Sequence, residues 1–101
     1  MDATLHALAE PRRREILALL REDELSAGEI ASRFPVSWPA ISQHLGVLKG
    51  AGLVAERREG TRRLYRARPE GLVELRAYLD GFWAAGLDRL KREVEREEAG
   101  R

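Results

Sequence analysis

The apolar residues in the first half of the chain recur at intervals of three and four, a spacing that indicates short amphipathic helices. Leu5 and Leu8 mark a first helix, and Pro11 suits the first turn of a second. Residues 26–29, Ser-Ala-Gly-Glu, have the form of a capping box that opens a third helix, which Pro35 ends. The pattern therefore predicts three short helices before residue 36.

A fourth helix is expected between residues 37 and 49. Ser37 can cap this helix and Pro39 suits its first turn, while Ile41, Leu45 and Leu48 form an apolar stripe along it. Two short helices joined by a tight turn that contains proline are the layout of a helix-turn-helix. The second helix of such a unit normally lies in the major groove of DNA.

The second half of the chain begins with two β-like runs, 53–58 and 62–68, separated by Glu-Gly-Thr, which is a hairpin signal. After Pro69 the pattern predicts one long helix that ends near residue 98. The predicted fold is therefore mainly α with a small β-hairpin, a winged helix-turn-helix. Its length indicates a single domain that spans residues 1–101.

The last helix carries a continuous apolar seam with one phase slip, at Phe82 and Trp83. The seam consists of Leu72, Leu75, Leu79, Phe82 or Trp83, Leu87, Leu90 and Val94. This seam is too apolar to face water alone, so it predicts a partner helix. The bulky residues at the slip, which lie near Gly81 and Gly86, could also shape an apolar pocket, but dimer packing explains them more simply.

Composition and charge narrow the chemistry. The chain has no cysteine, which excludes disulfides, thiolate metal sites and cysteine nucleophiles. It has no signal-peptide stretch and no apolar run near the ~18 residues that span a bilayer, so we expect a cytoplasmic protein. The net charge is only +1, but residues 56–68 hold six arginines and two glutamates. This basic segment either binds a polyanion or is a solvated surface.

The face of the fourth helix opposite the apolar stripe is small, polar and free of acidic residues. Gln43 can form a bidentate pair with adenine, and Ser42 and His44 can reach base edges or phosphates. An ordinary solvent-facing helix usually carries Glu and Lys, so we favour groove binding. Trp38 either stacks on DNA or packs against the third helix, and we favour packing. The candidate DNA contacts here are Ser37, Trp38, Pro39, Ser42, Gln43 and His44.

In the predicted hairpin, the residues nearest the tip are Arg58, Thr61, Arg62 and Arg63. Arginines at such a tip can follow phosphates or enter the minor groove. The alternative is an arginine-rich edge strand that resists aggregation. We favour phosphate contact for Arg62 and Arg63 and assign no role to the later arginines of the hairpin.

Three segments of the chain resemble the ArsR/SmtB family of bacterial transcriptional regulators. Residues 37–48 (SWPAISQHLGVL) with 51–54 (AGLV) resemble the recognition helix, 8–17 (LAEPRRREIL) the second helix, and 57–65 (RREGTRRLY) the wing. The resemblance covers about residues 4–95. It implies a homodimer that represses a promoter until a signal releases it, joined through the first helix and a last helix at about 70–98. The expected interface residues are Leu5, Leu8, Leu72, Leu75, Leu79, Phe82, Trp83, Leu87 and Leu90.

The metal-binding residues that many such regulators use are missing. His6 and His44 are the only histidines, and the carboxylates of Asp80, Asp88 and Glu93 on the last helix are better explained by surface salt pairs. We therefore expect no metal and no cofactor, and the chain has no catalytic motif. The expected partner is double-stranded operator DNA, with a small organic effector or none. The alternative is a winged-helix module that binds protein or RNA.

Overall fold

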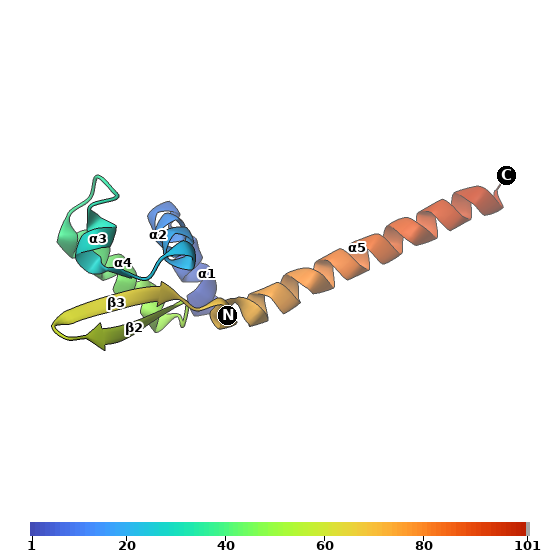
Figure 1. Cartoon of the computed structure of the whole chain (residues 1–101). Coiled ribbons are helices and arrows are strands. Elements are labelled where there is room, and N and C mark those ends of the chain that lie inside the picture. Colours follow the sequence, from blue (N-terminus) through green and yellow to red (C-terminus); the bar gives the residue numbers. More distant parts are fainter. Residues whose placement is uncertain (101) are drawn as a thin grey trace.

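The computed structural model describes residues 1–100 as a body of helices and strands from which one long helix projects (Figure 1). The molecule measures 71 × 25 × 23 Å along its principal axes. In chain order the elements are α1 (Asp2–Leu8), α2 (Pro11–Glu22), β1 (Leu25–Ser26), α3 (Ala27–Ala31), α4 (Trp38–Gly50), β2 (Val54–Glu59), β3 (Arg62–Ala67), the 3-10 helix η1 (Pro69–Leu72) and α5 (Val73–Ala99). The predicted winged helix-turn-helix is confirmed, with α3 and α4 as the helix-turn-helix and the β2–β3 hairpin as the wing.

The helix starts follow from the local sequence signals. At α3, Ser26 Oγ accepts a hydrogen bond from the Glu29 amide (3.2 Å), and the Glu29 carboxylate accepts one from the Ser26 amide (3.1 Å), which completes the capping box. Ser37 caps α4 by accepting a bond from the Ala40 amide (3.3 Å), and Pro11 begins α2. These caps define where the two helices of the helix-turn-helix begin.

Two arginines in the first turn of α2 hold α1 in place. Arg13 donates to the carbonyl oxygens of Ala7 (2.7 Å) and His6 (2.9 Å), and Arg14 donates to that of Leu8 (2.7 Å). The last carbonyls of a helix have no partner within the helix, so these guanidinium groups complete the C-terminal end of α1.

The sheet has a third strand that the hydrophobic pattern did not predict. β1 pairs antiparallel with β3, so the strand order is β1-β3-β2. A two-residue strand is too short to leave an alternation in the sequence. The β2–β3 turn contains Gly60 at a φ of +61°, a left-handed conformation that favours glycine. The added strand brings the segment before α3 alongside the wing.

The core lies between the helices of the body and one face of the sheet. Its buried residues are Ala7, Ile16, Leu20, Leu25, Ile30, Ile41, Leu45, Leu48, Leu53 and Val54. The predicted stripe of α4 is thus buried. Leu8 and Leu72, both expected at a dimer interface, are partly buried against this core of their own chain.

No residue of α5 is buried, although the helix is 27 residues long. The helix joins the body through η1, where Gly71 lies directly against Gly52, and the N-terminal ammonium of Met1 lies 3.4 Å from Glu74 of α5. A Cβ added at Gly71 would overlap the Gly52 carbonyl oxygen. Among the helices of residues 1–100, none has both the length and the apolar character needed to cross a bilayer.

Candidate nucleic-acid interface

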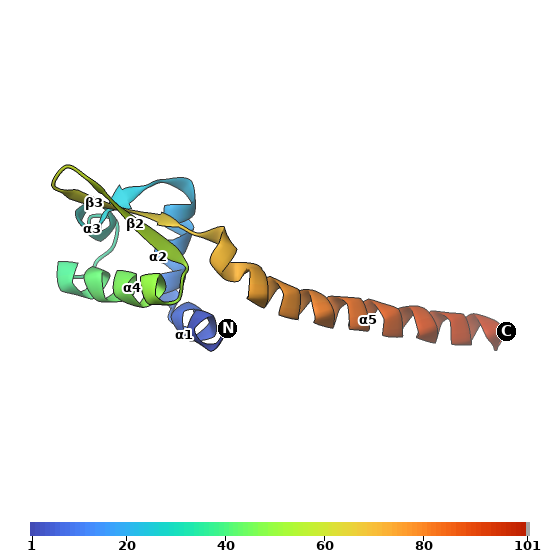
Figure 2. The same cartoon turned by 90° about the horizontal axis from the view of Figure 1, so that it is seen from below.

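The tip of the hairpin and the N-terminal end of α4 lie together at the end of the body away from α5 (Figure 2). Between them is a groove of about 430 Å³. Its lining consists of Ser26, Ala27, Trp38, Ser42, Thr61, Arg62, Arg63 and Tyr65. Five of the ten predicted DNA contacts therefore line one groove, although they come from two separate segments of the sequence. No carboxylate belongs to this lining.

The polar face of α4 is accessible. Pro39, Ser42 and Gln43 are exposed, while Ile41 and Leu45 on the opposite face are buried. This arrangement leaves the amide of Gln43 on the outer surface of the helix-turn-helix. Such a side chain can donate and accept at one base edge.

Two other predicted contacts on α4 also serve the fold. The hydroxyl of Ser37 accepts the capping bond from the Ala40 amide. His44 is half-buried, and its Nδ1 lies 3.5 Å from Nη1 of Arg13 on α2. His44 therefore also contacts the residue that holds α1, in addition to lying beside the polar face of α4.

The sequence left two roles open for Trp38, packing against α3 and contact with DNA, and its position in the structure is compatible with both. Its ring packs against α3, because a Cβ added at Gly28 would lie 2.6 Å from the indole Cζ3. The side chain is nevertheless 57% exposed and lines the groove. Glycine at position 28 thus makes room for an indole that remains available at the surface.

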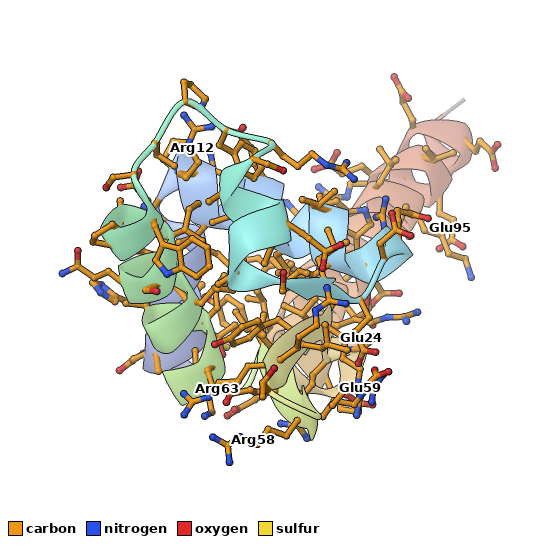
Figure 3. All side chains as sticks on the ribbon, turned by 60° about the vertical axis from the view of Figure 1, so that its left-hand side comes forward. Arg12, Glu24, Arg58, Glu59, Arg63 and Glu95 are labelled. Carbon is orange, nitrogen blue, oxygen red and sulfur yellow. The ribbon has the colours of Figure 1, made fainter. Side chains whose placement is uncertain are left out.

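The arginines of the wing are divided between the two faces of the hairpin. Arg58 pairs with Arg63 across the strands, and in Figure 3 these two side chains lie on one side of the hairpin while Glu24 and Glu59 lie on the other. Arg57 binds both of those carboxylates, at 2.6 and 3.1 Å. The charge of Arg57 is therefore neutralised within the chain.

Carboxylates also accompany the arginines that line the groove. Arg62 forms an ion pair with Glu29, and Arg63 Nε lies 3.6 Å from Glu56, which also accepts a bond from Lys49 (3.0 Å). Among residues 1–100, Arg58 forms no ion pair with a carboxylate. Arg58 is therefore the wing-tip arginine whose charge is least compensated.

These carboxylates remain charged at neutral pH. The hydrogen bond from Arg57 lowers the pKa of Glu24, and that from Lys49 lowers the pKa of Glu56. The pKa of Glu29 is lowered mainly by the backbone bond from Ser26, with smaller effects of the Ser26 hydroxyl and Arg62. Sequence reasoning missed these partners, and only Glu29 had a signal, the capping box.

The family of the chain follows from its relatives. Residues 10–56 match the family model described as bacterial regulatory protein, arsR family. Over 86 residues the chain is 50% identical to the HTH-type transcriptional regulator Rv2034 of Mycobacterium tuberculosis, which covers 85% of this chain and 80% of that protein. The chain belongs to the ArsR family. This ArsR-family protein is therefore a DNA-binding transcriptional regulator and not an enzyme.

Solved structures agree with this assignment. An ArsR-like transcriptional regulator from Rhodococcus sp. RHA1 superimposes with a TM-score of 0.77 at 34% identity, covering 89% of this chain and 85% of that one. A homodimeric winged helix-turn-helix DNA-binding domain from Mycobacterium bovis gives a TM-score of 0.66 at 36% identity, covering 82% and 77%. The fold of this ArsR-family protein is thus shared with structures of other regulators.

In this ArsR-family protein, the three carboxylates of α5 that the sequence singled out form surface salt pairs, as predicted. Asp80 pairs with Arg76 (3.7 Å), Asp88 with Arg92 (3.6 Å) and Glu93 with Arg89 (3.8 Å). Within residues 1–100, no three His, Asp or Glu side chains lie close enough together to hold a metal ion.

Proposed function

We propose that the protein is a homodimeric repressor that binds a palindromic operator. The α4 helix enters the major groove, where Gln43 and Ser42 read base edges, and the wing arginines bind the adjacent phosphates. The observation that carries this proposal is the groove between α4 and the wing tip, whose lining joins Trp38 and Ser42 of α4 to Arg62 and Arg63 of the wing. The exposed amide of Gln43 follows Ser42 on α4, and Arg58 lies opposite Arg63 in the hairpin.

Pairing through α5 is proposed because its apolar side chains have no cover. Leu79, Phe82, Trp83, Leu87 and Leu90 are each between 43% and 68% exposed. A helix with such a seam is stable in water when a partner buries it. The homodimeric relative from Mycobacterium bovis supports the same assembly. Two α4 helices would then meet half-sites about one helical turn, ~10 base pairs, apart.

Repression is the simpler regulatory outcome for such a dimer. The relatives of the chain include both repressors and activators. SdpR of Bacillus subtilis (42% identical over 60 residues) is named a transcriptional repressor, and HlyU of Vibrio cholerae (49% identical over 55 residues) is named a transcriptional activator. A dimer on promoter DNA represses by occupying it, whereas activation needs a further favourable contact with polymerase. We therefore propose repression.

The test uses the DNA upstream of the protein's own gene. Nuclease protection locates the operator, and titration of that duplex and a scrambled duplex across a salt series measures specificity and phosphate contact. We expect a protected imperfect palindrome and a reporter whose expression falls when the protein is present. Equal affinity for both duplexes, or an affinity that does not change with salt, would favour an interaction module that binds protein or RNA.

A further inference from the structure

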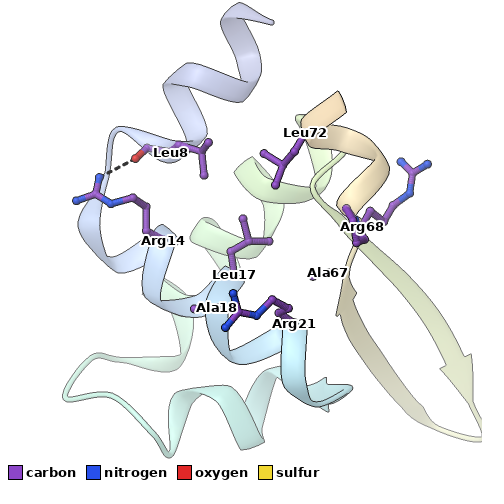
Figure 4. A pocket seen from close by; sticks show the side chains of 9 residues that line it. Leu8, Arg14, Leu17, Ala18, Arg21, Ala67, Arg68 and Leu72 are labelled. Carbon is purple, nitrogen blue, oxygen red and sulfur yellow. Dashed lines mark hydrogen bonds between the residues drawn. The ribbon is translucent and has the colours of Figure 1, made fainter. Parts of the chain in front are cut away.

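A second hollow in the body is separate from the groove between α4 and the wing. It lies among α1, α2, the end of β3 and η1, and its volume is about 300 Å³ (Figure 4). That volume is at the lower end of the range for small-molecule sites, roughly 300–1,000 Å³. None of its lining residues lines the groove.

The walls of this hollow are apolar. Leu8, Leu17 and Leu72 surround the space from three different elements, as Figure 4 shows, and Ala18 and Ala67 complete the walls. The small side chains of the two alanines leave room between α2 and β3. An apolar group entering here would remove both its own surface and these leucines from water.

The charged side chains of the hollow all have the same sign. Arg14, Arg21 and Arg68 belong to its lining, and no carboxylate does. Arg14 donates to the Leu8 carbonyl, Arg21 pairs with the neighbouring Glu22 (3.1 Å), and Arg68 lies 3.8 Å from Glu70. Both carboxylates are well exposed, so their pairing with arginine is weakened by solvent.

We propose that this hollow binds an organic monocarboxylate with an apolar tail, and that the bound ligand lowers the affinity for the operator. The tail fits the leucine walls and the carboxylate meets Arg21, because the guanidinium of Arg14 is bound to the Leu8 carbonyl and that of Arg68 donates to the Gly52 carbonyl (3.4 Å) (Figure 4). An uncharged ligand would not use the charge of Arg21, and a small inorganic anion would not fill the apolar walls.

The regulatory half of the proposal rests on the proposed function, in which α5 pairs two copies. The hollow is bounded by η1, which leads directly into α5, and by the last residue of β3, the strand of the wing. Gly71 contacts Gly52 directly, so η1 cannot move closer to the turn before β2. A ligand between α2 and η1 therefore changes the direction of α5 relative to α4, and with it the separation of the two α4 helices.

The experiment uses the full chain and three probes. Decanoate supplies tail and charge, decanol the same tail without charge, and acetate the charge without the tail. Binding is measured by calorimetry, and the methyl resonances of Leu8, Leu17 and Leu72 report its position. We expect decanol to bind about tenfold more weakly than decanoate and acetate at least about a hundredfold more weakly.

Three variants locate the binding. Ala18→Phe fills the hollow from an exposed position on α2, so it should fold normally and reduce decanoate affinity at least about tenfold. Arg21→Gln should weaken decanoate about threefold or more and leave decanol unchanged. The matched control Arg33→Gln removes an exposed arginine that does not line the hollow, and should change neither.

The site is disproved if decanoate does not bind, or if Ala18→Phe binds it as well as the wild type, which would point to the apolar seam of α5. Decanoate should weaken operator binding about tenfold, within the usual range of allosteric coupling. Binding at the hollow with no change in operator affinity would overturn the regulatory half alone. Failure of the free protein to bind any operator would overturn the proposed function, while the decanoate titration would still decide the site.

Discussion

The arginines of this protein differ in the groups that they contact, and these contacts determine how much of each charge is available to DNA. Arg13 and Arg14 satisfy carbonyl oxygens at the end of α1, and Arg57 is held between two carboxylates. Arg58 and Arg63 lie on the other face of the hairpin, near α4 (Figure 3). A charge that is already paired contributes less to binding phosphate than a free one. The total charge of the wing therefore overstates the charge that DNA would meet.

The first prediction separates base reading from phosphate binding. Gln43→Ala should cost ~1–3 kcal/mol on the operator and little on scrambled DNA, because a bidentate base contact is sequence-dependent. Arg63→Ala should weaken both and lower the salt slope by about one unit for each copy in the dimer. Fluorescence anisotropy across a salt series measures both. Equal weakening of the two duplexes by Gln43→Ala would show that α4 does not read sequence.

The second prediction concerns the ion pair of Arg62. Glu29→Gln preserves the capping box, which accepts Gln, but removes the charge that holds Arg62. Arg62 then becomes available to phosphate, so affinity for scrambled DNA should rise and the salt slope should steepen by up to about one unit per copy. Glu24→Gln is the matched control, since its partner Arg57 does not line the groove. A similar effect of both variants would mean that only net charge matters.

At the scale of elements, the junction before α5 depends on one close backbone approach. Gly52 has a φ of +76°, and its carbonyl oxygen lies where any side chain at Gly71 would have to stand. This contact seats η1 against the turn between α4 and β2, and so it orients the long helix.

The third prediction tests that junction. Gly71→Ala should destabilise the protein by about 1–3 kcal/mol, because the added methyl meets backbone and must push η1 away. The control is Gly50→Ala in the same region, where a Cβ meets nothing within 4 Å. That variant should change stability by less than about 1 kcal/mol. Urea unfolding at one protein concentration measures both, and equal stabilities would disprove the proposed constraint.

At the scale of the whole molecule, α5 extends far from the body without burying any of its side chains. A lone helix of this kind gains little stability from its own hydrogen bonds, so tertiary or quaternary packing must supply the rest. The exposed seam is the surface that such packing would use.

The fourth prediction is that Leu79→Asp converts the dimer into a monomer. A charge in the seam would lose its hydration on pairing. Operator affinity should fall at least about a hundredfold, because a single half-site lacks the second linked contact. Ala77→Asp, ~160° around the helix from Leu79, is the matched control and should change neither property. Sedimentation and operator titration test both variants, and a wild-type monomer at micromolar concentration would contradict the proposed assembly.

Features governed by near neighbours could be predicted from the sequence. The capping box at Ser26, the cap at Ser37 and the stripe of Ile41, Leu45 and Leu48 depend on residues three or four positions apart. The hairpin between β2 and β3 has its turn signal at Gly60. These local rules were sufficient for the helix-turn-helix and the wing hairpin, but not for the two-residue strand β1.

Only the tertiary structure decided which distant residues meet. Arg57 and Arg62 pair with Glu24 and Glu29, each 33 positions earlier, because β1 lies beside β3. The hollow between α2 and η1 and the contact of Gly71 with Gly52 likewise join segments that carry no mutual signal in the sequence. Hydrophobic periodicity records whether a side chain is buried, but not which neighbour lies across the core or the sheet. That pairing is determined only when all the elements pack together.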